Sequence, residues 1–191
     1  MKIFFTTTYE GKENFGEYYL KLFQEIKSLG YEHLDNEAAV ITYKEYVDKM
    51  SRGREEQVKN YHQKMNYIQK ADICIIESSA HSLGNGFIVQ KALESSKPTI
   101  VLYYKDNVPY FLSGVENDKL IVASYDEDNY AKVLKKVINT AREKRDKRFN
   151  FFLSPKLLQY IDEGSKKRGI TKSKLLRDMI VEHMREHADD E

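Results

Sequence analysis

Two short, continuous apolar segments constrain the fold of this chain most strongly. They lie within residues 72–77 (Asp-Ile-Cys-Ile-Ile-Glu) and 99–104 (Thr-Ile-Val-Leu-Tyr-Tyr), and neither alternates apolar with polar side chains. A strand that is apolar on both sides is expected in a parallel sheet covered by helices on both faces, because a strand with one face in water would alternate. We therefore predict a parallel sheet with strands at these two places.

Helical and strand patterns alternate along residues 1–142. Apolar side chains spaced three and four apart predict helices, and the other short apolar runs predict strands. The predicted strands are 2–6, 31–34, 72–77, 99–104 and 120–123, and the predicted helices are 15–29, 54–70, 87–93 and 130–145. Residues 35–50 are polar and mixed, so we expect a long loop or irregular element there. The alternation predicts an α/β fold with an open, doubly wound parallel sheet of about five strands and right-handed crossovers.

Composition excludes few classes of protein. The single cysteine, Cys74, cannot form an internal disulfide, which fits a reducing cytoplasm. No stretch approaches the ~18 apolar residues of a membrane helix, and the first residues lack the long apolar segment of a signal peptide. The net charge of +1 favours no class of partner by itself. We expect a cytoplasmic protein without a membrane partner, and no motif requires a cofactor.

The predicted sheet indicates where a ligand would bind. Ligands of doubly wound sheets lie beyond the carboxyl ends of the strands, which here include residues 6–11 and 77–86. The second segment contains Ser82-x-Gly84-x-Gly86 before a predicted helix, where glycine permits close backbone approach and a helix N-terminus offers free N–H groups. A tight turn without a ligand explains this short spacing equally well. The candidate ligand-binding residues are Thr6, Tyr9, Gly11, Ser82, Gly84, Asn85, Gly86 and Ser113.

The residues around this loop resemble those of a known enzyme family. The segments that carry the resemblance are Phe5-Thr6-Thr7-Thr8-Tyr9-Glu10-Gly11, Ala71-Asp72-Ile73-Cys74-Ile75-Ile76-Glu77, Ser82-Leu83-Gly84-Asn85-Gly86-Phe87 and Lys97-Pro98-Thr99-Ile100. Over residues 2–138 the chain resembles the nucleoside 2-deoxyribosyltransferase-like family, and within it the 2′-deoxynucleoside 5′-phosphate N-hydrolase branch. The resemblance implies a nucleoside or nucleotide ligand. It also implies cleavage or transfer at the N-glycosidic bond, with one carboxylate attacking the anomeric carbon and another handling the proton on the base.

The positions that would perform this chemistry are changed in this chain. The resemblance places the family's nucleophilic glutamate at Ile88, an aspartate of the preceding helix at Lys64, and a phosphate-facing arginine at Glu10. Ile88 has no lone pair with which to attack, and Glu10 would repel a phosphate. We therefore predict that the fold is retained and the chemistry is lost.

Part of the site implied by the resemblance is kept. Ser82 and Ser113 match family positions that contact the phosphate, and Ser113 would reach in from a neighbouring subunit. The alternative to lost chemistry is a relocated carboxylate, for which Glu77 is the candidate because it ends a strand at the predicted site. Glu77 could equally be a hydrogen-bond partner of the loop that follows it.

Residues 147–191 form a separate candidate domain. Residues 148–154 are a short strand candidate, and Ser154-Pro155 has the N-cap and first residue of a helix. One strand and two helices cannot bury a core alone. The segment 147–187 resembles the ribbon-helix-helix fold of bacterial repressors, in which strands of two chains pair, and Gly169-Ile170-Thr171-Lys172-Ser173 matches its inter-helix turn. The resemblance implies a homodimer, and self-association of both domains would give a tetramer.

The same resemblance implies contacts with duplex DNA. The paired strands of such dimers enter the major groove, where alternate residues read base edges. Arg148, Asn150 and Phe152 would point outward, and Phe152 departs from the polar residue expected there. The turn residues Thr171, Lys172 and Ser173 would place backbone N–H groups against a phosphate. The open alternative is that this segment only dimerises.

Two classes of function follow. The first is a ligand-responsive DNA-binding regulator, and the second is an N-glycosidase or deoxyribosyltransferase oligomerised by residues 147–191. A third interpretation treats the α/β domain as an interaction module. His183-x-x-Glu186-His187 superficially matches a zinc-protease pattern. No cleft or further ligand accompanies it, so we interpret it as a solvated helix face and expect no metal.

Overall fold

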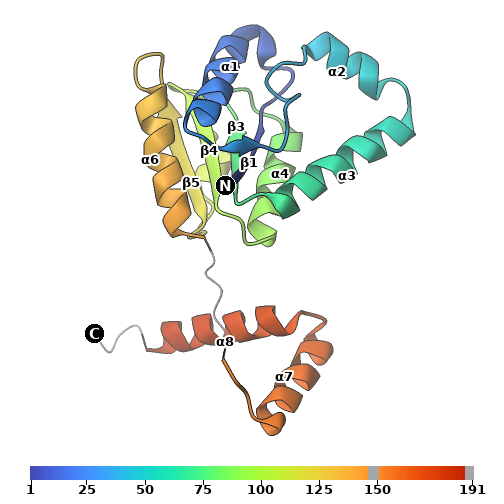
Figure 1. Ribbon diagram of the computed structural model, residues 1–191, viewed down its shortest axis with the longest axis vertical. Helices are drawn as coiled ribbons and strands as arrows, with labels where there is room; N and C mark the ends of the chain where they lie inside the picture. The colour runs from blue at the N-terminus through green and yellow to red at the C-terminus, as the bar shows by residue number, and fades with distance from the viewer. Residues whose placement is uncertain (146–150, 188–191) are drawn as a thin grey trace. The chain divides into compact units, whose positions relative to one another are not determined.

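The computed structural model describes residues 1–145 and 151–187. Contacts along the chain divide it into two compact units, Met1–Asp146 and Lys147–Glu191 (Figure 1). Among the helices described, none combines the length and the apolar character needed to cross a membrane.

The N-terminal unit is built on one five-stranded parallel sheet. Its strands are β1 (Lys2–Thr6), β2 (Glu32–His33), β3 (Ile73–Glu77), β4 (Thr99–Tyr104) and β5 (Leu120–Tyr125). Their order in the sheet is β2-β1-β3-β4-β5. The prediction of an open parallel sheet of about five strands is confirmed. This order reverses direction between β1 and β3, which is where ligands bind in doubly wound folds.

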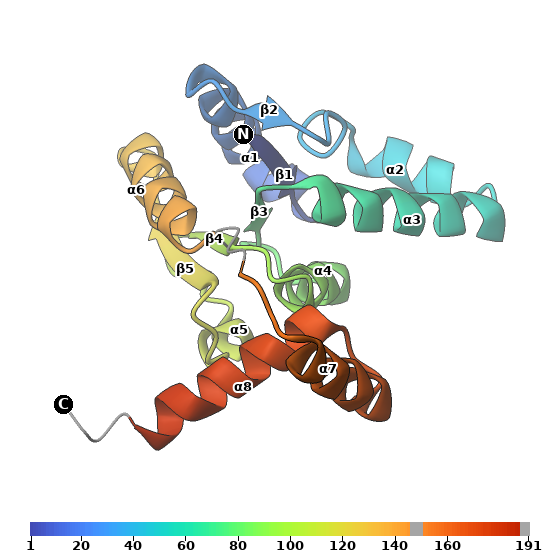
Figure 2. The same ribbon diagram turned by 60° about the horizontal axis from the view of Figure 1, so that its bottom comes forward.

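Helices cover both faces of this sheet. They are α1 (Lys12–Ser28), α2 (Tyr43–Met50), α3 (Arg54–Lys70), α4 (Leu83–Glu94), α5 (Tyr110–Ser113) and α6 (Tyr130–Glu143). Figure 2 shows α1 and α6 on one side of the sheet and α3 and α4 on the other. The sheet is therefore buried between two layers, which explains why its central strands are apolar without alternation.

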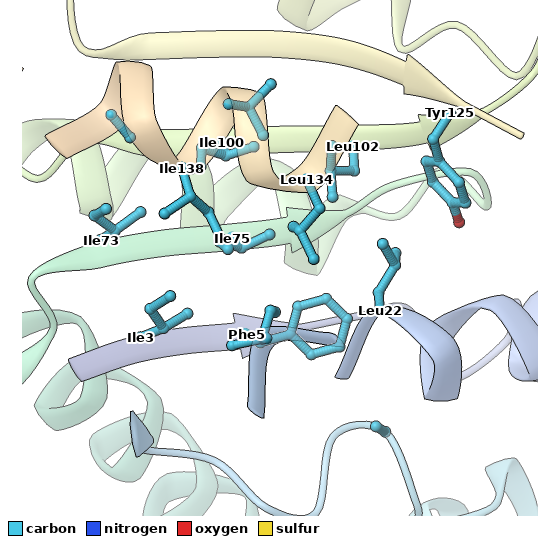
Figure 3. Packing of buried hydrophobic residues seen from close by; sticks show 14 residues of the cluster. Ile3, Phe5, Leu22, Ile73, Ile75, Ile100, Leu102, Tyr125, Leu134 and Ile138 are labelled. Carbon is cyan, nitrogen blue, oxygen red and sulfur yellow. The ribbon is translucent and has the colours of Figure 1, made fainter. Parts of the chain in front are cut away.

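Successive residues of the central strands serve the two layers in turn. Ile3, Phe5, Ile73 and Ile75 pack against α1 and α6, as Figure 3 shows. Phe4, Cys74 and Ile76 point to the opposite face and pack against α3 and α4. Because side chains of a strand alternate between faces, each strand residue packs against the helices on one side of the sheet. Cys74 is fully buried, and burial raises the pKa of its thiol to about 12, so it is inert as a nucleophile.

Several element boundaries differ from the predictions. Residues 35–50 are not wholly irregular, because helix α2 forms at Tyr43–Met50. A capping box begins this helix: the Thr42 side chain accepts the Glu45 backbone N–H, and the Glu45 side chain accepts the Thr42 backbone N–H. The helix predicted at 87–93 begins at Leu83, since Ser82 caps it. The predicted strand at 31–34 contracts to two residues, while β5 extends to Tyr125.

The C-terminal unit consists of α7 (Pro155–Arg168) and α8 (Lys172–Glu186). Ser154 caps α7 ahead of Pro155, as predicted. Gly169 ends α7 with φ +63°, and Thr171 caps α8, so the turn between the two helices lies at the residues that match the family's inter-helix turn. The predicted strand at 148–154 is absent from residues 151–154 of the single chain. The pairing of this segment with a second chain, which the ribbon-helix-helix resemblance implies, stays a prediction. Arg148 and Asn150 lie outside the described residues.

Candidate functional site

A cavity of about 390 Å³ lies at the carboxyl ends of β1 and β3, where the strand order reverses. We call it the switch-point cavity. Its lining comprises Thr6, Thr7, Thr8, Tyr9, Glu10, Tyr46, Asn60, Tyr61, Lys64, Met65, Ser82, Leu83, Gly84, Asn85, Phe87 and Ile88. Five of the eight predicted ligand-binding residues are among them: Thr6, Tyr9, Ser82, Gly84 and Asn85. Its volume is within the range of small-molecule sites in proteins.

Aromatic rings provide much of the cavity wall. Tyr9 and Tyr46 stack face to face, with ring centroids 3.7 Å apart and planes at 7°. Tyr61 and Phe87 form a second, tilted pair at 6.2 Å. Broad aromatic surfaces of this kind suit a planar ligand such as a nucleobase. Sequence reasoning missed Tyr46 because it expected no helix there, although the Thr42-x-x-Glu45 capping signal preceding it was available.

A buried ion pair lies beside these rings. The Lys64 ammonium of α3 binds the Asp35 carboxylate, and both side chains are almost completely buried. The same ammonium lies 3.5 Å from the Tyr9 hydroxyl. Burial, with the nearby carboxylates of Asp35 and Glu37, raises the pKa of Tyr9 far above its ordinary value, so its hydroxyl stays protonated. The site thus contains a neutral phenol and an ammonium whose charge is already matched.

A second lysine lies close to this pair. The Lys12 ammonium is 5.9 Å from the centre of the Tyr9 ring, and its nitrogen is buried without a hydrogen-bond partner among the described residues. Burial lowers the pKa of Lys12 to about 8, with Asp35 opposing and Lys64 reinforcing the change. Lys12 therefore loses its proton more readily than an exposed lysine does.

The three positions that the family resemblance assigns to chemistry meet at the switch-point cavity. Glu10, Lys64 and Ile88 come from the β1–α1 loop, from α3 and from α4, and all three line it. Ile88 presents an aliphatic side chain, and Lys64 presents an ammonium held by Asp35. Glu10 is the only carboxylate among the lining residues. The cavity can bind through rings, hydroxyls and N–H groups, but it lacks the pair of carboxylates that glycosidic cleavage uses.

The start of α4 presents backbone donors to this cavity. The Ser82 hydroxyl accepts the Asn85 N–H at 3.1 Å, and the Ser82 carbonyl accepts the Gly86 N–H. The Asn85 side chain is buried and donates to the Glu77 carbonyl at 2.9 Å. Helix geometry leaves the N–H groups of Leu83 and Gly84 without partners inside the helix. Asn85 therefore anchors the loop, while Leu83 and Gly84 offer donors to a ligand.

Glu77 is not positioned to replace the missing nucleophile. Its side chain is fully buried and lines neither this cavity nor a second cavity that residues of α4 and α5 line. It accepts hydrogen bonds from the Ser79 hydroxyl and from the Tyr125 hydroxyl, the latter at 2.9 Å. The candidate relocated carboxylate is therefore a partner of the loop that follows β3, which was the other interpretation of its sequence position.

Three predicted ligand-binding residues lie outside the switch-point cavity. Gly11 is buried, and a Cβ atom there would overlap the Tyr19 hydroxyl and lie 2.6 Å from the Ala80 Cβ, so packing accounts for this glycine. Gly86 lines a separate, mostly apolar cavity of about 570 Å³. Ser113 is exposed in α5, and its hydroxyl donates to the Pro109 carbonyl at 3.3 Å. A contribution of Ser113 to a second chain stays a prediction.

The predicted DNA-contacting residues within the described part of the C-terminal unit are exposed. Phe152 is fully exposed. The Thr171 hydroxyl accepts the Lys174 N–H, which fixes the first turn of α8. The Lys172 ammonium is paired with Asp162 of α7 at 2.6 Å, so its charge is partly matched within the unit. Ser173 is also exposed. Contacts of these residues with DNA stay a prediction.

Comparison with known proteins identifies solved structures only: no family model and no curated protein matches the sequence. The chain is similar to the CMP N-glycosidase BcmB of Clostridium botulinum, with 18% identity over 73% of this chain and 98% of that one, and a TM-score of 0.45. It is also similar to Smu.1420 from Streptococcus mutans UA159, with 14% identity over 75% of this chain and 100% of that one, and a TM-score of 0.37.

Proposed function

We propose that this chain is a ligand-responsive DNA-binding regulator. In this proposal the switch-point cavity binds a nucleoside or nucleotide without cleaving it, and the C-terminal unit forms a ribbon-helix-helix dimer that binds duplex DNA. The observation that carries the first half is the meeting of Ile88 and the paired Lys64 in one cavity, at the positions where the resemblance requires carboxylates.

The C-terminal unit supports the second half of the proposal. Of its apolar side chains, only Ile161 and Leu175 are buried within the described part of one chain. Large apolar side chains of both helices remain exposed, namely Leu157, Leu158, Tyr160, Met179, Ile180, Val181 and Met184. Two helices of this length cannot stabilise themselves with so small a core. A second copy would cover these exposed apolar side chains.

Ligand binding is tested most sharply at Tyr46. We expect purified full-length protein to bind a nucleoside or nucleotide saturably, and Tyr46→Ala to weaken that binding by about 1–3 kcal/mol through loss of a stacking surface. Tyr43→Ala is the matched control, because Tyr43 belongs to the same helix but does not line the cavity. Calorimetry would give the affinities. Equal affinities for the two variants, or no binding by the wild type across a nucleoside and nucleotide panel, would contradict the proposal.

The alternative function is an N-glycosidase or deoxyribosyltransferase, and one observation favours it. Glu10 lines the switch-point cavity and is exposed, so a carboxylate can reach a bound ligand. Chromatography of the same incubations separates the two functions. The proposed regulator leaves the ligand intact, whereas release of a free base, abolished by Glu10→Gln, would establish the enzyme.

A further inference from the structure

The last turn of α8 brings three metal-ligating side chains together. His183, Glu186 and His187 are spaced three and four residues apart, so they share one face of the helix. One ligand atom from each lies within 4.8 Å of the other two, and all three residues are exposed. The two imidazole rings are 4.2 Å apart between centroids. Within the part of the chain that the structure describes, no other group of three such residues is arranged in this way.

The orientation of His187 favours metal binding. Its Nδ1 atom lies 2.9 Å from the His183 carbonyl oxygen. A carbonyl oxygen can only accept, so this hydrogen bond places a proton on Nδ1, and in the neutral imidazole Nε2 then carries the lone pair that a metal needs. Metal-bound histidines are commonly oriented in this manner, by donating their other ring N–H to a carbonyl or carboxylate. The backbone of the same helical turn therefore preorganises one ligand.

The chemistry of the three donors indicates the class of ion. Two imidazoles and one carboxylate suit zinc and neighbouring divalent transition metals, whereas magnesium and calcium prefer oxygen ligands alone. Zinc–ligand bonds of about 2.0–2.2 Å require donor atoms separated by about 4 Å or less. The present donor atoms lie within 4.8 Å of one another, so binding would require these exposed side chains to rotate toward a common point.

In place of the sequence-based expectation of no metal, we propose that His183, Glu186 and His187 of each chain bind one divalent transition-metal ion, with zinc as the representative, and that water completes its coordination. The zinc-protease interpretation of this pattern fails because a protease needs a cleft, but binding alone needs only the three donors. A metal bridging residues four apart ties the final turn of α8 together. To the extent that the ion binds the folded turn more tightly than the unfolded chain, it stabilises the helix end.

Zinc titration of untagged full-length protein tests this inference. We expect calorimetry to give one ion per chain, and His183→Gln and His187→Gln each to weaken binding by at least about tenfold, the smallest effect usual for losing even an outer-shell partner. His62→Gln is the matched control, because it removes an exposed histidine of α3 in the other unit. Cobalt substitution gives a second readout, since the visible spectrum of Co²⁺ changes when imidazole binds.

Three results would overturn the inference. They are the absence of saturable zinc binding, binding that persists in the His183→Gln/His187→Gln double variant, and a stoichiometry of one ion per two chains, which would indicate a bridge between copies. Far-ultraviolet circular dichroism of the metal-free variants verifies that they fold, as expected for substitutions at exposed positions. None of these results depends on a nucleotide or on DNA, so this inference and the proposed function fail independently.

Discussion

Replacing Asp35 with asparagine is expected to lower the free energy of unfolding by about 3–5 kcal/mol. Asp35 and Lys64 form an ion pair in which both side chains are nearly inaccessible to water, with 4% and 10% of their surface exposed. The substitution leaves the Lys64 ammonium charged, buried and without its carboxylate. The carboxylate also accepts the N–H groups of Glu37 and Ala38 at 3.0 and 3.2 Å, so the start of the following segment depends on it as well.

Urea denaturation of three variants separates this effect from a general loss of charge. Glu37→Gln is the matched control, because it breaks the neighbouring and more exposed Glu37–Lys49 pair. Such pairs contribute about 0–1 kcal/mol. The double variant Asp35→Leu/Lys64→Met removes both buried charges and should recover much of the loss, since apolar replacement of a whole buried pair is often neutral. A loss for Asp35→Asn no larger than that for Glu37→Gln would contradict the large contribution of the buried pair to stability.

The second large effect is a pH dependence of stability that originates at Glu77. Burial raises the pKa of Glu77 to about 7 from an ordinary value of 4.5, and hydrogen bonds from Ser79 and Tyr125 oppose that rise. Between these two values the folded chain holds a proton that the unfolded chain has released. The contribution of Glu77 to stability is therefore largest below pH 4.5, and it is lost as the pH rises to about 7. At 1.36 kcal/mol per pH unit the loss amounts to roughly 3 kcal/mol.

Comparison of wild type with Glu77→Gln isolates this contribution. The amide keeps a similar shape but cannot ionise, so the variant should lose the decline between pH 4.5 and about 7. Carboxylates whose pKa is lowered do not affect this comparison, because they titrate below this pH range. Hydrogen bonds from Lys166 and Lys172, for example, lower the pKa of Asp162 to about 2. Parallel stability curves for the two proteins across this interval would contradict the buried, protonated state of Glu77.

The parts of the fold that sequence predicted are those with strong local patterns. Strands β3 and β4 are apolar on both faces, and α3 and α6 match the predicted ranges closely because their apolar spacing is regular. Helix α2 was missed because none of its side chains is buried. An apolar stripe could not reveal it, and only its capping box distinguishes it from a loop.

The candidate site was predictable to the extent that strand ends determine it. Thr6 and Ser82 follow from the rule that ligands lie at the carboxyl ends of parallel strands. Glu77 was misplaced because that rule ignores which face a side chain occupies. It shares the strand face of Ile73 and Ile75 and so faces the layer of α1 and α6, whereas residues of α3 and α4 line the cavity. The contact of Asp35 with Lys64 joins residues 29 positions apart, and no local pattern encodes it.

In the proposed function one chain couples a non-cleaving nucleotide site to a DNA-binding dimer. Binding of the full-length protein to random-sequence duplex DNA across a salt series tests the DNA-binding half directly. We predict tight binding at low salt, with an affinity that falls steeply as salt increases. A log–log slope of about −0.9 for each phosphate neutralised would count the contacts, and a nucleotide that binds the switch-point cavity should shift the affinity. No binding at low salt would contradict the regulator and leave the C-terminal unit as an oligomerisation module.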